Sequence, residues 1–116
     1  MRPCATREQV LEVRDRVREV AVDEKIKRYA VDLVRETRRA AGVSLGASPR
    51  ASLSLVRIAK ALAFIDGLDY VAPQHVQEIA VEVIAHRIVI DPQARFSGVS
   101  AASLVADLVR TVAVPA

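Results

Sequence analysis

The segment from Ser48 to Asp66 constrains the fold most, because apolar side chains occupy nearly all of its sides. The apolar positions are Leu53, Leu55, Val56, Ile58, Ala59, Leu62, Ala63 and Ile65. A helix that is apolar most of the way round must be covered by neighbours on several sides. We therefore expect a central helix over 48–66, with other helices packed around it.

Four further segments show the three- and four-residue apolar spacing of surface helices. These helices are predicted over 6–19, 23–41, 73–86 and 101–112. Thr6 and Gln9 form a capping-box pattern, and Asp23 and Ser100 are good helix caps. The chain has 116 residues, of which only 3% are aromatic. This predicts one domain, 1–116, folded as a small all-α bundle of about five helices.

The connecting segments are less regular. Ile88–Ile90 is either a short extended segment or an anchored loop, and Arg95–Gly98 is predicted to be a loop. Ala72 stands where a hydroxyl would cap the helix over 73–86, which is expected to cost about 1 kcal/mol.

Charge and cysteine content exclude several classes of protein. The net charge is +3, from 17 basic and 14 acidic residues, which is too small to indicate nucleic-acid binding. The only cysteine, Cys4, excludes an internal disulfide and a zinc cluster. Residues 1–4 lack the apolar run of a signal peptide, and no apolar stretch is long enough to span a bilayer. We expect a cytoplasmic protein without membrane contact.

The sequence predicts no catalytic residue and no metal site in this chain taken alone. It contains no phosphate-binding loop, no G-x-G-x-x-G, no paired carboxylates and no Cys/His/Asp set. His75 and His86 are eleven residues apart without suitable co-ligands, so each is interpreted as a packed or surface histidine. The arginines near the end of the second helix are explained by the helix dipole. They are Arg35, Arg38 and Arg39.

The start of the helix over 48–66 is the candidate binding site. Ser48 is expected to cap this helix, Pro49 to take its first position, and Arg50 to follow. A cation at this end of an isolated helix is unfavourable. An anion placed there would meet both free N–H groups and a guanidinium. The residues alone leave two alternatives, which are a solvated arginine at an ordinary helix start and a phosphate contact.

Three marks together resemble the C-terminal helical lid domain of MoxR-type AAA+ ATPases, over nearly the whole chain. They are the string Gly46-Ala47-Ser48-Pro49-Arg50-Ala51, the turn Gly67–Pro73, and the pair His86-Arg87. The resemblance implies that Arg50 is the sensor 2 arginine, with Ser48 and Pro49 positioning it. That arginine would reach the phosphates of ATP, bound with Mg²⁺ in an α/β core domain that this sequence does not contain.

The resemblance also implies a chaperone-like role and several partners. The expected partners are the AAA+ core domain, neighbouring ring subunits and von Willebrand-A-type domain proteins. The sequence departs from the family pattern around the fourth helix, with Leu68, Ala72, Gln74 and His75 at positions where the family has other residues. These departures concern the cap of that helix and its surface, not the position of Arg50.

Two other functions remain as alternatives, a stand-alone helical adaptor and a helical nucleic-acid-binding module. The helix over 48–66 is too apolar to lie in a nucleic-acid groove, which disfavours the second alternative. A lid that docks on another domain is expected to leave apolar surface uncovered when alone. We predict such a patch near the helix start at Ser48.

Overall fold

The computed structural model describes residues 3–115, so Met1, Arg2 and Ala116, at the ends of the predicted domain 1–116, lie outside the described residues. The elements are α1 (Arg7–Arg18), α2 (Glu24–Arg39), β1 (Val43–Leu45), α3 (Arg50–Ile65), α4 (Pro73–Ile84), the short 3₁₀ helix η1 (Ala85–Arg87), β2 (Val89–Ile90), α5 (Pro92–Phe96) and α6 (Ala101–Thr111). The all-α class is confirmed. No helix within residues 3–115 combines the length and apolar character needed to cross a bilayer.

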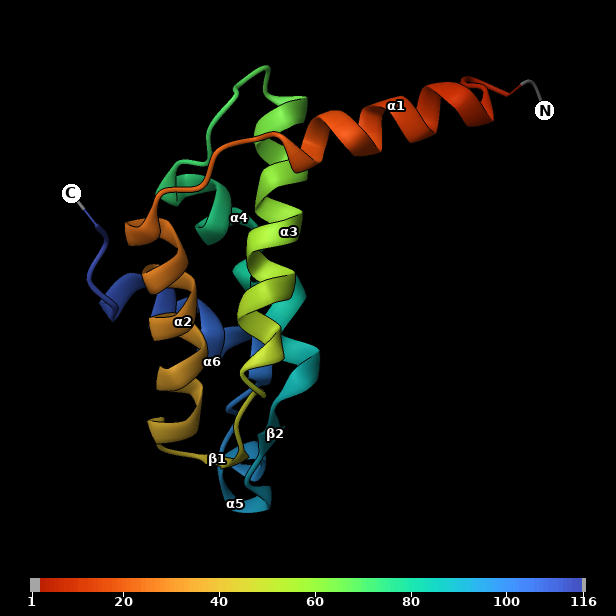
Figure 1. Cartoon of the computed structure of the whole chain (residues 1–116). Coiled ribbons are helices and arrows are strands. Elements are labelled where there is room, and N and C mark those ends of the chain that lie inside the picture. Colours follow the sequence, from red (N-terminus) through yellow and green to blue (C-terminus); the bar gives the residue numbers. More distant parts are fainter. Residues whose placement is uncertain (1–2, 116) are drawn as a thin grey trace.

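Four helices form the body of the molecule. α3 packs against α2 and α4, and α6 packs against α2 and α4 (Figure 1). The core between them contains the large buried side chains Tyr29, Leu33, Leu55, Val76, Ile84 and Val105. On α3 the buried stripe is mostly alanine, at Ala51, Ala59 and Ala63. Because these side chains are small, the backbones of neighbouring helices can approach α3 closely.

The prediction that α3 is covered on several sides is wrong for three of its large apolar side chains. Leu53, Ile58 and Ile65 are 59%, 44% and 77% exposed. The buried alanine stripe repeats every four residues and therefore faces one side of the helix only. Leu53 and Ile65, which lie away from this stripe, remain uncovered within residues 3–115, although the end of α1 contacts α3 at Lys60.

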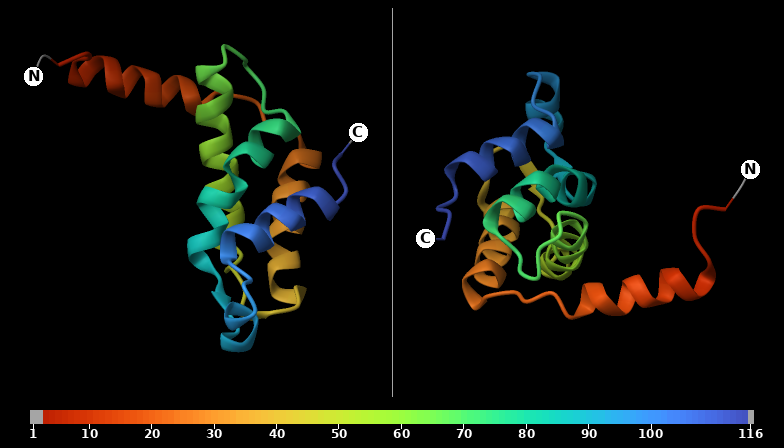
Figure 2. Two further views of the ribbon diagram at one scale, coloured as in Figure 1. Left: turned by 180° about the vertical axis from the view of Figure 1, so that it is seen from behind. Right: turned by 90° about the horizontal axis from the view of Figure 1, so that it is seen from above.

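α1 projects away from the body, as the views in Figures 1 and 2 show. None of its residues is buried. The chain that follows it is anchored to the turn after α3 by two backbone hydrogen bonds. The Ala21 N–H donates to the Asp69 carbonyl at 2.8 Å, and the Val71 N–H donates to the Ala21 carbonyl at 2.9 Å. The end of α1 also contacts α3, where Lys60 Nζ donates to the Arg18 carbonyl at 2.8 Å, so the base of this helix is fixed.

The segment Ile88–Ile90 includes strand β2, which pairs antiparallel with β1. Val43 lies opposite Ile90, and the Asp91 N–H donates to the Gly42 carbonyl at 2.7 Å. Of the two alternatives for this segment, the extended one is therefore correct. The small sheet ties the loop after α2 to the segment after α4.

The loop predicted over Arg95–Gly98 is wrong in its first two residues, which belong to α5. The Asp91 carboxylate accepts the Gln93 N–H at 3.1 Å, and Pro92 takes the first helical position. An Asp-Pro pair therefore starts a short helix here, because it supplies both a cap and a preset φ.

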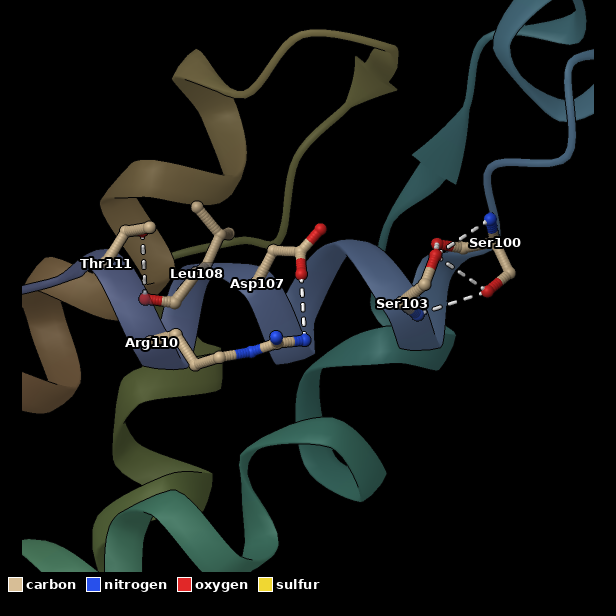
Figure 3. Close-up of polar contacts among 6 residues, drawn as sticks. All are labelled: Ser100, Ser103, Asp107, Leu108, Arg110 and Thr111. Carbon is tan, nitrogen blue, oxygen red and sulfur yellow. Dashed lines mark hydrogen bonds and ion pairs between the residues drawn. The ribbon is translucent and has the colours of Figure 1, made fainter.

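Helix caps follow the predicted residues at α1, α2 and α6. In α6 the Ser103 N–H donates to Ser100 Oγ at 3.1 Å, and the Ser100 N–H donates to Ser103 Oγ at 3.2 Å (Figure 3). Two turns further along the helix, Arg110 pairs with Asp107 at 3.0 Å on the exposed surface. The reciprocal serine bonds satisfy donors that would otherwise lack a partner at this end of the helix.

At the start of α4 a histidine compensates for part of the missing cap. His75 is only 4% exposed, and its Nδ1 accepts the Ala72 N–H at 2.9 Å. Its Nε2 lies 3.1 Å from Asp66 Oδ2. Since Nδ1 must be unprotonated to accept, the ring proton is on Nε2 and donates to the carboxylate. His75 thus joins the end of α3 to the start of α4, whereas His86 is exposed.

The substitution His75→Ala is expected to lower the free energy of unfolding by about 2 kcal/mol, because it removes two hydrogen bonds and buried packing. His86→Ala is the matched control and is expected to change it by less than about 0.5 kcal/mol. Urea unfolding of both variants measures the difference. Equal midpoints for the two variants would contradict the connecting role of His75.

Candidate functional site

The three predicted site residues lie together at the start of α3. Ser48, Pro49 and Arg50 are all exposed, and Arg50 is the first residue of the helix. Within residues 3–115 the Arg50 guanidinium makes no ion pair and no hydrogen bond. The side chain is therefore available to a ligand or to another domain.

The predicted roles of Ser48 and Pro49 in starting the helix are wrong by one position. Pro49 occupies the cap position, and no side chain caps the helix there. The Ser48 carbonyl, rather than its hydroxyl, closes the first turn by accepting the Ala51 N–H at 2.9 Å. The Ser52 N–H in turn donates to the Pro49 carbonyl at 3.2 Å. Because these amides already have partners, the Arg50 guanidinium is the main group that this helix start can offer to an anion.

The loop before α3 is held by the last turns of α2. The Ala47 N–H donates to Thr37 Oγ1 at 3.0 Å, and Arg38 Nε donates to the Ala47 carbonyl at 3.2 Å. Thr37 Oγ1 itself donates to the Val34 carbonyl at 2.6 Å. Thr37 and Ala47 are both fully buried. We call Thr37, Arg38 and Ala47 the Ala47 clamp, because both backbone polar groups of Ala47 are bound by neighbouring residues of α2.

Gly46 brings this loop into direct contact with the α2 backbone. A Cβ at Gly46 would lie 2.6 Å from Arg38 Cγ and 2.8 Å from Arg38 Cα. Its φ is not in the left-handed region. Glycine is needed here for close approach and not for an unusual backbone conformation.

Basic side chains from separate elements surround the helix start. Arg38 and Arg87 line a surface hollow together with Leu45, Ser48 and Pro49. Arg35 lines an adjacent hollow with Arg38 and Ser52. Such a group of cations produces a positive local potential that attracts anions. The helix dipole explains these arginines of α2 only in part, since Arg38 also binds Ala47.

Exposed apolar side chains lie where the uncovered patch was predicted. Leu45 lines the same hollow as Ser48 and Pro49 and is exposed. Leu53 lies one turn after Arg50 on α3 and is also exposed. The helix start therefore presents a cation flanked by apolar surface. Within residues 3–115, no three side chains of the metal-binding types converge.

The corrected helix start makes a stability prediction. Ser48→Ala is expected to change the free energy of unfolding by less than about 0.5 kcal/mol, because the hydroxyl caps nothing. Ser100→Ala, which removes a real cap, is expected to lower it by about 1 kcal/mol. Thermal or urea unfolding of the two variants compares them directly. An equal loss in both would show that Ser48 does cap α3 in solution.

Comparison with known proteins identifies the family. The AAA lid domain profile matches residues 35–108. The uncharacterized protein YeaC of Bacillus subtilis is 35% identical over 115 residues, which are 99% of this chain and 36% of YeaC. Chaperone MoxR1 of Mycobacterium tuberculosis is 41% identical over 73 residues, which are 63% of this chain and 19% of MoxR1.

A solved structure agrees with these relatives. The crystal structure of a "putative ATPase" from Cytophaga hutchinsonii superposes with a TM-score of 0.87 and 31% identity, over 94% of this chain and 36% of that protein. The chain thus spans little more than a third of the longest-matching relatives. The fold, the matched residues and the relatives agree, and the chain belongs to the AAA lid domain family, as a lid of the MoxR-type AAA+ ATPases.

Proposed function

We propose that Arg50 is the sensor 2 arginine of this lid. In the proposed mechanism it binds the phosphates of ATP, which a separate α/β core holds together with Mg²⁺. The observation that carries the proposal is an exposed guanidinium, at the first residue of α3, that has no partner among the described residues. Arg38 and Arg87, which line the neighbouring hollow, add positive charge.

Arginine suits this role for chemical reasons. Its planar guanidinium can donate two parallel hydrogen bonds to phosphate oxygens, and it stays charged at any physiological pH. Charge spread over the transferring phosphoryl group is what an arginine stabilises during hydrolysis. Arg50 need not break an internal ion pair before it binds, which avoids a cost that a paired arginine would have.

Lid closure would follow from the same contact. An arginine that binds the γ-phosphate favours the closed arrangement while ATP is present, and hydrolysis removes that preference. The exposed side chains of Leu53, Ile58 and Ile65 on α3 supply apolar surface that a core or a neighbouring ring subunit can cover.

The proposal extends to the role, the partners and the compartment of the protein that contains this lid. Chaperone MoxR1 is a relative by sequence, which supports a chaperone-like role for the protein that contains this lid. The MoxR-type resemblance adds von Willebrand-A-type domain proteins as partners. The free, exposed Cys4 fits a reducing compartment such as the cytoplasm.

A stand-alone adaptor is the second candidate, and α1 favours it. This helix projects from the body and leaves Val10 and Val13 exposed, so it offers a face to a partner protein. The nucleic-acid-binding alternative gains nothing from the structure, because large apolar side chains of α3, namely Leu53, Ile58 and Ile65, are exposed on a helix that would need a polar surface to enter a groove.

The native reading frame upstream of Met1 distinguishes the two candidates. The ATPase proposal requires a G-x-x-x-x-G-K-[ST] loop after a strand-like segment within about 200 residues, roughly one or two domains. A stop codon immediately upstream would instead favour the adaptor.

In the product of that frame, Arg50→Ala is expected to lower ATP turnover about 100-fold, the loss typical of removing one donor to a transition-state oxygen. Its free energy of unfolding is expected to stay within about 0.5 kcal/mol, since the side chain is exposed. Arg57→Ala, an exposed arginine two turns along the same helix, is the control and keeps full turnover. Equal turnover in the two variants would reject the sensor 2 assignment.

A further inference from the structure

We infer that Thr37 and Arg38 are positioning residues for Arg50 and act on it through the Ala47 clamp. The inference rests on the proposed function of Arg50. It assigns to the end of α2 a part in nucleotide contact, although neither Thr37 nor the Nε of Arg38 has to touch the nucleotide. The starting observation is that neighbouring residues of α2 bind the N–H and the carbonyl of the same loop residue.

The segment between the clamp and Arg50 has little freedom. Only Ser48 and Pro49 separate Ala47 from Arg50, and the proline ring restricts φ at Pro49, which is −55°. On the far side of Arg50, Ala51 is fully buried against the core. Arg50 is therefore an exposed residue held between two buried alanines, and the clamp determines where its Cα lies.

The threonine hydroxyl is well defined as an acceptor. Its own hydrogen is donated to the Val34 carbonyl, so an oxygen lone pair is left for the Ala47 N–H. Thr37 and Ala47 are both fully buried. In such surroundings hydrogen bonds are stronger and an unpaired amide is costly. Loss of the hydroxyl would leave the Ala47 amide without a partner and loosen the loop.

Arg38 is the second residue that holds Ala47, and a lysine has no Nε–H with which to replace it. Its Nε binds the Ala47 carbonyl, while the side chain also lines the hollow beside Ser48 and Pro49. The close contact of Gly46 with the Arg38 backbone holds the loop directly against the end of α2. A displacement of the end of α2 would therefore move the loop, and the start of α3 with it.

A double-mutant cycle in the ATPase tests the inference. Thr37→Val is expected to lower ATP turnover about tenfold, because small misplacements of a positioned group are costly. In an Arg50→Ala background the same substitution is expected to have no further effect, because the two act as one unit. Thr37→Ser, which keeps the hydroxyl, restores turnover. Arg38→Lys gives an independent second variant if Thr37→Val unfolds.

Arg39 supplies the matched control. It neighbours Arg38, is exposed and forms a surface ion pair with Glu36 at 3.8 Å, so Arg39→Gln is expected to leave turnover unchanged. If Thr37→Val lowers turnover equally in both backgrounds, its role is merely structural and the inference is overturned while the proposed function stands. If Arg50→Ala alone has no effect, the proposed function fails, and the positioning role fails with it.

Amide hydrogen exchange in the 116-residue chain tests the inference without a measurement of ATP turnover. Thr37→Val is expected to speed exchange at Ala47, and at Ala51 and Ser52 in the first turn of α3, by about tenfold or more, since a lost hydrogen bond of about 1.4 kcal/mol corresponds to that factor. Arg39→Gln leaves these rates unchanged. Unchanged rates in Thr37→Val would overturn the inference whether or not the chain is joined to a core.

Discussion

The structure depends most on the way that α2 holds the loop before α3. Both polar backbone groups of Ala47 are bound by Thr37 and Arg38, and Gly46 lies against the Arg38 backbone. A loop with these contacts cannot shift without leaving buried polar groups unpaired, which is costly in a low-dielectric interior. The direction in which α3 begins, and with it the place of Arg50, follows from this attachment.

The two sides of α3 serve different purposes. Small buried alanines on the inner side allow close packing against α2 and α4. Away from these alanines, Leu53, Ile58 and Ile65 remain exposed, and exposed apolar side chains of this size are typical of a surface that binds another protein. The helices thus enclose a core of their own and also carry the uncovered apolar surface expected of a domain that packs against another one. Membership in the AAA lid family accounts for that surface.

Local signals in the sequence predicted much of the fold. The features that could not be predicted depend on contacts between residues far apart in the sequence. Caps at Thr6, Asp23 and Ser100 depend on residues within three positions, so they could be identified from spacing alone. The Ala47 clamp joins residues nine and ten positions apart, and no periodicity marks it. The covering of α3 was overestimated because apolarity shows what a helix can bury, not which neighbours are present. The role proposed for Arg50 comes from the family resemblance, because the local chemistry left both a solvated arginine and a phosphate contact open.

The most direct test of the central claim is a crystal structure of the native protein with a non-hydrolysable ATP analogue and Mg²⁺ bound. In that structure the Arg50 guanidinium is expected to lie within about 3 Å of a γ-phosphate oxygen, the usual distance of a charge-assisted hydrogen bond. The Ala47 clamp is expected to be intact in the same structure. An analogue bound with Arg50 still in solvent, and its phosphates held by other residues, would contradict the account.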